Sequence, residues 1–171
     1  MKRIFLLPVV LLLAVPAAAQ TADYAPERVE QAISFAELKA VVAALGHVVE
    51  AEDPGNQSLR AATGDGTRYL LTGTACDIDG VPGCRGIVMQ VLFEGAATVT
   101  LDKLAEANLK QVAVSTRFDP ASGVLSVTRY VVLDGGATMA NVAQNVEVLL
   151  ALAPEVVAIV LAGEPGTARP D

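Results

Sequence analysis

The chain is poor in the residues that metal, redox and nucleic-acid chemistry require. Its 171 residues include no tryptophan, two cysteines and one histidine, and only 4% are aromatic. A structural zinc site needs several Cys or His ligands with recognisable spacing, so this composition argues against one. Basic residues are also scarce: 12 Lys and Arg stand against 19 Asp and Glu, and a net charge of −7 repels phosphate backbones. The composition therefore predicts no metal, no other cofactor and no nucleic-acid partner.

Motifs for nucleophilic or redox catalysis are absent as well. The sequence contains no G-x-S-x-G, and its two cysteines are not spaced as C-x-x-C. Gly80 ends an Asp-Ile-Asp-Gly stretch, but a calcium loop would then need carboxylates at Ala75 and Gly86. A hydrolytic triad would have to use His47, the only histidine. We predict a protein without a catalytic centre, and keep a hydrolase-like enzyme using His47 as the weaker alternative.

Apolar residues are concentrated at the N-terminus. Lys2 and Arg3 precede an apolar run over 4–15, and residues 17–19 are all alanine. This order of charge, apolar run and small residues is typical of a secretory signal peptide, with cleavage expected between Ala19 and Gln20. The apolar run is too short to span a bilayer core of roughly 30 Å. We therefore predict a periplasmic or secreted protein that has no membrane attachment after cleavage.

The rest of the chain has the length of one domain with short flanking segments. Without the signal peptide (1–19) it loses Lys2 and Arg3, which leaves 10 basic and 19 acidic residues and a net charge of −9. Its polar start predicts a flexible lead-in over 20–32, and its Gly- and Pro-containing end predicts a disordered tail over 163–171. The folded domain is expected over 33–162.

Cys76 and Cys84 are separated by seven residues that are rich in turn formers. In an exported protein two close cysteines predict a disulfide bond, and a hairpin would bring these two strand ends together. Closing so short a loop contributes about 2–3 kcal/mol in the chain-entropy estimate. Free thiols are the alternative.

The first predicted helix begins after Ser34. Ser34 and Glu37 have capping-box spacing, Ile33 can pack on Leu38, and Gly46 is placed to end the helix. Later elements follow from β-branched runs, turn residues and N-cap threonines. They are strands over 47–52, 58–62, 67–74 and 85–93, a helix after Thr100, strands over 111–118 and 124–133, and a helix after Thr138.

This order of elements predicts the fold class. Helix, strands, helix, two strands and helix do not alternate as β-α-β units do, so we predict an α+β fold in which helices pack on an antiparallel β-sheet. The helix after Thr100 is expected to pack with Leu101, Leu104, Ala105 and Leu109 on its apolar side. Pro154 is expected to break or kink the last helix.

Several short motifs are similar to the YbjN family of bacterial regulators. They are Leu-Gly-His-Val-Val-Glu over 45–50, the pair Cys76 and Cys84, Leu-Ala-Glu-Ala-Asn over 104–108, Arg117-Phe118, and Leu-Asp-Gly-Gly over 133–136. The resemblance covers roughly residues 33–162. It implies a fold similar to type III secretion chaperones, which often dimerise, and it implies no known reaction. At the second helix the family usually has Asn-x-Trp-Asn. Asn108 matches the first Asn, but Lys110 stands where the Trp is expected and Gln111 where the second Asn is expected, which puts in doubt any role that depends on the aromatic.

Asn108 is spaced from Leu101 and Leu104 so that its amide falls on the expected buried side of the second helix. A buried amide needs hydrogen-bond partners, so we expect Asn108 to tie this helix to a neighbouring strand end. A contact with a ligand or a partner is the alternative.

Five arginines are distributed one to each main predicted strand: Arg60, Arg68, Arg85, Arg117 and Arg129. If several of them share one face of the sheet, that face could bind a small anion or an acidic peptide. The alternative is a solvated face on which they pair with nearby carboxylates, each pair contributing a few tenths of a kcal/mol.

The last helix carries more apolar surface than one contact with the sheet requires. Its predicted interface comprises Leu149, Leu150, Val156, Val157 and Val160. Such a surface serves either a homodimer or client interface, or a thick contact inside the core. Taken together, the sequence predicts an exported, non-enzymatic module, chaperone-like or regulatory, that binds a protein client or a second copy of itself. A binder of a small anion or acidic peptide on the arginine-bearing face is the main alternative.

Overall fold

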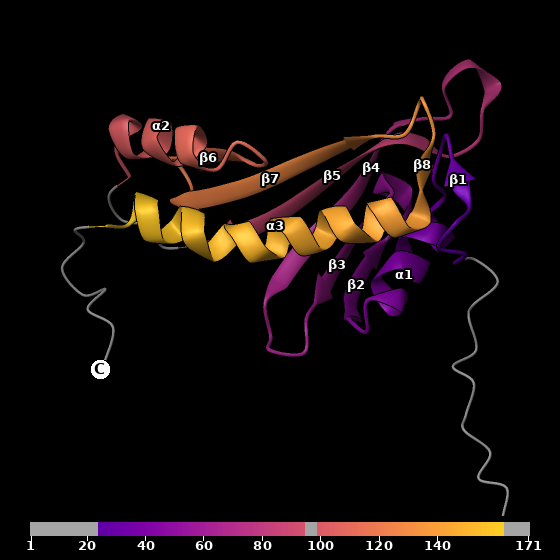
Figure 1. Ribbon diagram of the computed structural model, residues 1–171, viewed down its shortest axis with the longest axis horizontal. Coiled ribbons are helices and arrows are strands. Elements are labelled where there is room, and N and C mark those ends of the chain that lie inside the picture. Colours follow the sequence, from indigo (N-terminus) through magenta and orange to yellow (C-terminus); the bar gives the residue numbers. More distant parts are fainter. Residues whose placement is uncertain (1–23, 95–98, 163–171) are drawn as a thin grey trace, which may run out of the picture.

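The computed structural model describes residues 24–94 and 99–162 (Figure 1). The helices are α1 (Phe35–Ala44), α2 (Leu101–Lys110) and α3 (Met139–Val160), with short 3-10 turns at Pro54–Asn56 and Ile78–Gly80. The strands are β1 (Val29–Glu30), β2 (Val48–Asp53), β3 (Ser58–Ala62), β4 (Arg68–Cys76), β5 (Cys84–Phe93), β6 (Ser115–Asp119), β7 (Val124–Val132) and β8 (Ala137–Thr138). The predicted signal peptide (1–19) and tail (163–171) lie outside the described residues.

Six of these strands form one antiparallel sheet, in the order β2-β3-β4-β5-β7-β6. The short strands β1 and β8 pair separately, also antiparallel. The helices pack against the larger sheet, so the predicted α+β class is confirmed.

Local signals placed α1 where the sequence predicted it. The Ser34 hydroxyl accepts a hydrogen bond from the Glu37 N–H at 3.3 Å, and the Glu37 carboxylate accepts one from the Ser34 N–H at 2.8 Å. Gly46 follows the helix with a φ of +71°, a left-handed conformation that glycine adopts without steric cost. Both ends of α1 are therefore fixed by short-range chemistry.

The helices cover one face of the sheet. α3 packs on β5 and β7, with α1 beside its N-terminal part and α2 beside its C-terminal part (Figure 1). The main core lies between α3 and this face, where side chains such as Leu71, Met89 and Val127 of the sheet and Val146 and Leu149 of the helix are fully buried.

α3 is one continuous helix, so the predicted break at Pro154 was wrong. Pro154 is exposed, and its neighbours Ala153 and Val156 are fully buried in the core. Burial of residues on both sides outweighs the single hydrogen bond that proline removes. By length and mean hydropathy (1.6) this helix could also cross a membrane. Nine of its side chains are buried in the fold, and the others are half-buried or exposed.

The predicted flexible lead-in is folded in its described part, 24–32, because it completes the start of α3. The first N–H groups of a helix have no partner within the helix. Here the carbonyls of Pro26 and Arg28 accept from Ala140 and Met139, each at 3.0 Å, and β1 pairs with β8. The Arg28 guanidinium also pairs with the carboxylates of Glu30 and Glu37.

The strand expected over 111–118 begins later, at Ser115. Gln111 caps α2 by donating its N–H to the Ala107 carbonyl, and the Val114 N–H bonds the Gln111 carbonyl to close a turn. These residues therefore belong to the helix end and the turn that follows it.

Candidate functional site

The strands of the large sheet present different side chains on their two faces. In β4, Tyr69 and Leu71 are buried on the helix side, whereas Arg68 and Leu70 point to the other side. Residues that lie directly opposite each other on neighbouring strands point to the same side of the sheet. On this second side they form a row of Arg60, Leu70, Gln90, Thr128 and Ser115. We call this side the open face, because none of the helices in the described part of the chain packs on it.

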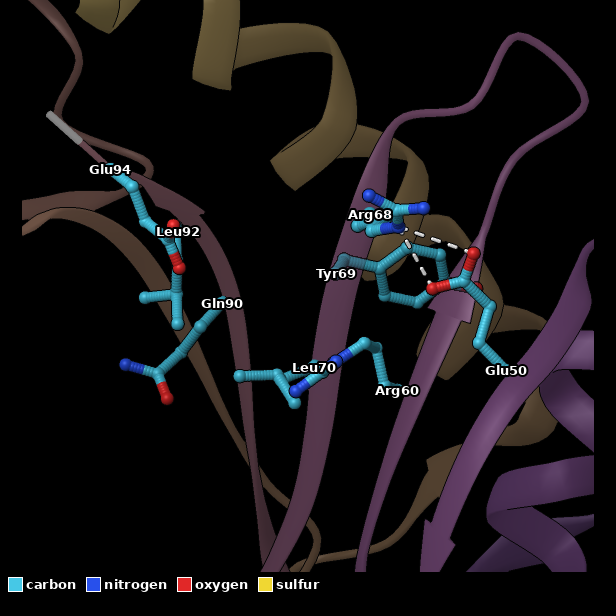
Figure 2. A pocket seen from close by; sticks show the side chains of 8 residues that line it. All are labelled: Glu50, Arg60, Arg68, Tyr69, Leu70, Gln90, Leu92 and Glu94. Atoms are coloured by element: carbon cyan, nitrogen blue, oxygen red, sulfur yellow. Dashed lines mark hydrogen bonds and ion pairs between the residues drawn. The ribbon is translucent and has the colours of Figure 1, made fainter.

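The open face is hollowed in two adjoining places. The first hollow has a volume of about 460 Å³, and its lining includes Glu50, Arg60, Arg68, Leu70, Gln90, Leu92 and Glu94 (Figure 2). The second has about 520 Å³, and its lining includes Gln90, Leu92, Arg117, Asp119 and Ser126. Gln90 and Leu92 line both hollows, so the two join into one groove that crosses the strands from β3 to β6. We call it the open-face groove.

The three arginines of the groove differ in how they are held. Arg68 donates through Nε to both carboxylate oxygens of Glu50, at 2.9 and 3.2 Å, the pair joined by dashed lines in Figure 2. Arg60 and Arg117 form no hydrogen bond or ion pair with any residue in the described part of the chain. Two guanidinium groups, one in each hollow, are therefore available to a bound anion.

The groove contains only three of the five arginines that the sequence singled out. Arg85 pairs with Asp79 and Asp134, at 3.5 and 3.6 Å, in loops near the opposite ends of the strands. Arg129 lies opposite Met89 and therefore on the helix-covered face. A one-residue difference in register moves a side chain to the other face, so a count of one arginine per strand did not determine which of them meet.

Arg129 instead forms a polar connection inside the fold. Its Nε donates to Oδ1 of Asn145 on α3 at 2.5 Å, and its Nη1 donates to the carbonyl of Ala113. The Asn145 amide nitrogen donates to the Asn141 carbonyl at 2.7 Å. The sequence prediction missed this role of Asn145, although its helical spacing from Val142 and Leu149 places it on the buried side.

The floor of the groove is polar at its centre and partly apolar around it. Gln90 donates through Nε2 to the hydroxyls of Ser126 and Thr128, at 3.2 and 3.3 Å. Leu92 in the groove is 43% exposed, and Tyr130, on the open face outside the groove, is 53% exposed, which is unusual for large side chains at the middle of a sheet. This mixture of donors, acceptors and exposed apolar groups suits the binding of another molecule.

The predicted interface on α3 is largely part of the core. Leu149, Val156 and Val160 are buried against the sheet and the other helices, and Leu150 and Val157 are half-buried beside them. The excess of apolar residues therefore serves a thick internal contact, and three of the five residues are not accessible to a partner.

The packing predicted for α2 was right only at Leu104, which is half-buried against the core; the other three residues of the expected apolar side are exposed. Leu101 is 83% exposed and Leu109 is 79% exposed, whereas Ala107 is the fully buried residue of this helix. α2 lies at a corner of the molecule, where its main contacts are with β6 and the end of α3. An amphipathic stripe showed which side is apolar but not how much of that side another element covers.

Asn108 is exposed, contrary to the predicted buried position, yet all of its amide hydrogens and its oxygen are used. Oδ1 accepts from the Thr116 N–H at 2.8 Å, and Nδ2 donates to the carbonyls of Thr116 at 3.2 Å and Leu104 at 2.9 Å. The side chain thus pairs with the free edge of β6 as the peptide group of another strand would. It ties α2 to that strand.

His47, the residue that a hydrolase would have to use, is bonded to a buried tyrosine. Its Nδ1 lies 2.9 Å from the Tyr69 hydroxyl, and the two rings meet edge to face. Burial raises the pKa of the Tyr69 hydroxyl above its ordinary value, which keeps it protonated as a donor. Within the described part of the chain, no serine or cysteine side chain bonds to His47, so this geometry contains no activated nucleophile.

Cys76 and Cys84 form a disulfide bond, as predicted, with an S–S distance of 2.08 Å. They lie opposite each other at the ends of β4 and β5. The backbone of Cys84 also exchanges two hydrogen bonds of 2.9 Å with Ile33, which attaches the residue before α1 to the sheet. Such a bond fits an oxidising, extracellular compartment.

Among the described residues, no group of three or more His, Cys, Asp or Glu side chains could hold a metal ion. No protein-family model matches the chain, and no curated protein matches it significantly. The resemblance to the YbjN family therefore stays a prediction.

Proposed function

We propose that the chain is an exported, non-enzymatic protein-binding module with the chaperone-like or regulatory role of a YbjN-like protein, and that it binds its partner on the open face. One observation carries this proposal. The helices cover one face of the six-stranded sheet, whereas the open face is uncovered, hollowed and partly apolar. Surfaces with exposed apolar groups and a few directed polar groups are typical of binding sites.

Both edges of the sheet are protected against the addition of another strand, which favours the open face as the binding surface. β2 carries Glu50, Glu52 and Asp53, and its register is interrupted between Val49 and Ala51. Charged residues and bulges protect an edge against the addition of another strand. At the other edge, Asn108 occupies the backbone groups of Thr116. Strand addition is therefore disfavoured on both sides.

Export is supported by two independent features. Residues 1–19 have the pattern of a signal peptide, and the Cys76–Cys84 bond is of the kind that persists in oxidising compartments. On these two grounds we propose a periplasmic or secreted location.

The proposal is tested by site-specific photo-crosslinking in the cells that make the protein. A benzophenone amino acid replaces Leu92 on the open face, and in a matched control it replaces Gln144, which is exposed on α3. We expect a discrete adduct from position 92 and none from position 144. A second substitution on the open face, Leu70→Glu in the hollow that Leu92 lines, is expected to reduce that adduct.

Two results would count against the proposal, and a third would identify the partner. An adduct from position 144 alone places the partner on the helices, and equal labelling at both positions indicates non-specific contact. An adduct of twice the mass of the chain means that the open face binds a second copy, in place of a client.

A further inference from the structure

We propose that the partner segment on the open face is an acidic polypeptide in an extended conformation, with two carboxylates that reach Arg60 and Arg117 at the two ends of the open-face groove. This inference rests on the function proposed above and specifies the chemistry of the partner. It follows from the charges, the length and the floor of the groove.

The groove is lined by three arginines and three carboxylates, and two of the arginines form no ion pair with a described residue. Glu50 is bonded to Arg68, so these two groups neutralise each other. The Asp119 carboxylate accepts from the Ser122 hydroxyl at 2.6 Å and the Ala121 N–H at 3.0 Å, and these bonds hold its pKa below the ordinary value. Glu94 is the remaining carboxylate of the lining. Arg60 and Arg117 have no partner among the described residues, and a guanidinium forms its strongest hydrogen bonds with carboxylates.

The distance between these two arginines suits a chain rather than a small anion. Arg60 is on β3 and Arg117 is on β6, with β4, β5 and β7 between them. At a strand spacing of about 4.8 Å, the two Cα atoms lie roughly 20 Å apart. An extended peptide rises about 3.3 Å per residue, so two acidic side chains roughly six positions apart span this distance and point to the same side. A single small anion reaches only one of the two.

The floor between the arginines offers contacts for a peptide backbone. Gln90 uses its Nε2 on Ser126 and Thr128, and within the described part of the chain its Oε1 accepts no hydrogen bond. That oxygen is free to accept a peptide N–H. Leu70 and Leu92 flank it and provide apolar surface on either side (Figure 2). The groove thus combines two charged ends with a floor suited to a short extended segment.

Calorimetric titration of the mature protein with capped nine-residue peptides tests this inference. One peptide carries two glutamates six positions apart, a second carries them two positions apart, and a third carries glutamines in their place. At low salt we expect the first peptide to bind at least about fivefold more tightly than the other two, with an affinity that falls as salt is added.

Arginine variants show which side chains of the groove bind the glutamates of the peptide. Arg60→Gln and Arg117→Gln are each expected to weaken binding of the first peptide about fivefold or more. Inside the groove, the control is the double variant Glu50→Gln/Arg68→Gln, which removes one ion pair and leaves the net charge unchanged; outside it, the control is Arg85→Gln, whose arginine pairs with Asp79 and Asp134. Both controls are expected to change the affinity by less than about twofold. Thermal unfolding shows whether each variant is folded.

Several outcomes would overturn the inference. Equal binding of the glutamine peptide excludes charge recognition, and sensitivity to only one of the two arginines indicates a small-anion site. Binding of none of the peptides, while position 92 still captures a partner in cells, excludes an acidic segment and leaves the proposed function standing. If the benzophenone amino acid at position 92 captures no partner in cells, the proposed function itself is contradicted.

Discussion

The two faces of the six-stranded sheet are built from neighbouring residues of the same strands, yet they differ in almost every property. On the helix-covered face, Tyr69, Leu71, Met89 and Val127 are buried to within 1% of full coverage. On the open face, Leu92 and Tyr130 are about half exposed, and Arg60 has no partner among the described residues. The covered face accounts for stability. The open face buries less apolar surface, and it is the face on which we propose that a partner binds.

The largest expected effect compares adjacent leucines on β4. Leu71→Ala removes a fully buried side chain and is expected to lower the free energy of unfolding by about 2–5 kcal/mol, because it leaves a cavity. Leu70→Ala, on the open face, is expected to cost about 1 kcal/mol or less. Denaturant unfolding at equilibrium measures both. Equal losses would mean that the open face is also part of the core.

A second comparison adds one methyl group on each side of the sheet. A Cβ at Gly73 would lie 2.5 Å from Sγ of Cys84, which the disulfide holds in place, so Gly73→Ala is expected to cost about 1–3 kcal/mol. A Cβ at Gly86 would lie 2.2 Å from the Tyr130 hydroxyl oxygen. That ring is half exposed and can swing into solvent, so Gly86→Ala is expected to cost less than about 1 kcal/mol. Thermal unfolding of the two variants gives the order, and the reverse order contradicts the account.

A third prediction concerns the edge of the sheet that Asn108 occupies. Asn108→Ala removes two hydrogen bonds to the backbone of Thr116 and is expected to destabilise the fold by about 1–2 kcal/mol. Leu109→Ala, at the next and largely exposed position, is expected to change stability by less than about 0.5 kcal/mol. Hydrogen exchange of the Thr116 amide provides a local measurement. Unchanged protection of this amide in Asn108→Ala would show that Asn108 does not hold the edge.

The smallest effect is expected on the solvent side of α2. The Lys110 ammonium and then that of Lys103 lower the pKa of the Glu106 carboxyl to about 2. Because this pKa is lower in the folded state, the associated stability is present above the ordinary value of 4.5 and is lost as the pH falls from there towards 2. Lys110→Gln is expected to raise the Glu106 pKa in an NMR titration. Lys39→Gln, on α1, serves as the control and is expected to leave it unchanged.

Features that depend on a few neighbouring residues were predictable from the sequence. The Ser34–Glu37 capping box, the turn after Asp119 and the Cys76–Cys84 bond are each determined within a short segment. The antiparallel α+β class followed from the order of such segments. The sequence was sufficient wherever the interacting groups are close along the chain.

Features that depend on pairing between distant segments were not predictable. The register of β5 with β7 places Arg129 under α3 and Gln90 beside Thr128, and no local pattern specifies that register. The exposure of Leu109 and the continuity of α3 through Pro154 likewise depend on what else packs nearby. The open-face groove depends on the order of the strands in the sheet. The sequence could therefore suggest some of its residues one by one, but it could not show which of them lie together.

The central claim is that the partner binds the open face. The most direct measurement is an NMR titration of the isotope-labelled mature protein with the partner identified by crosslinking. The account predicts that the signals of Leu70, Gln90, Leu92 and Ser126 shift, while those of exposed residues on α2 and α3, such as Leu109 and Gln144, do not. Shifts confined to α2 or α3, with the open face unchanged, would contradict it.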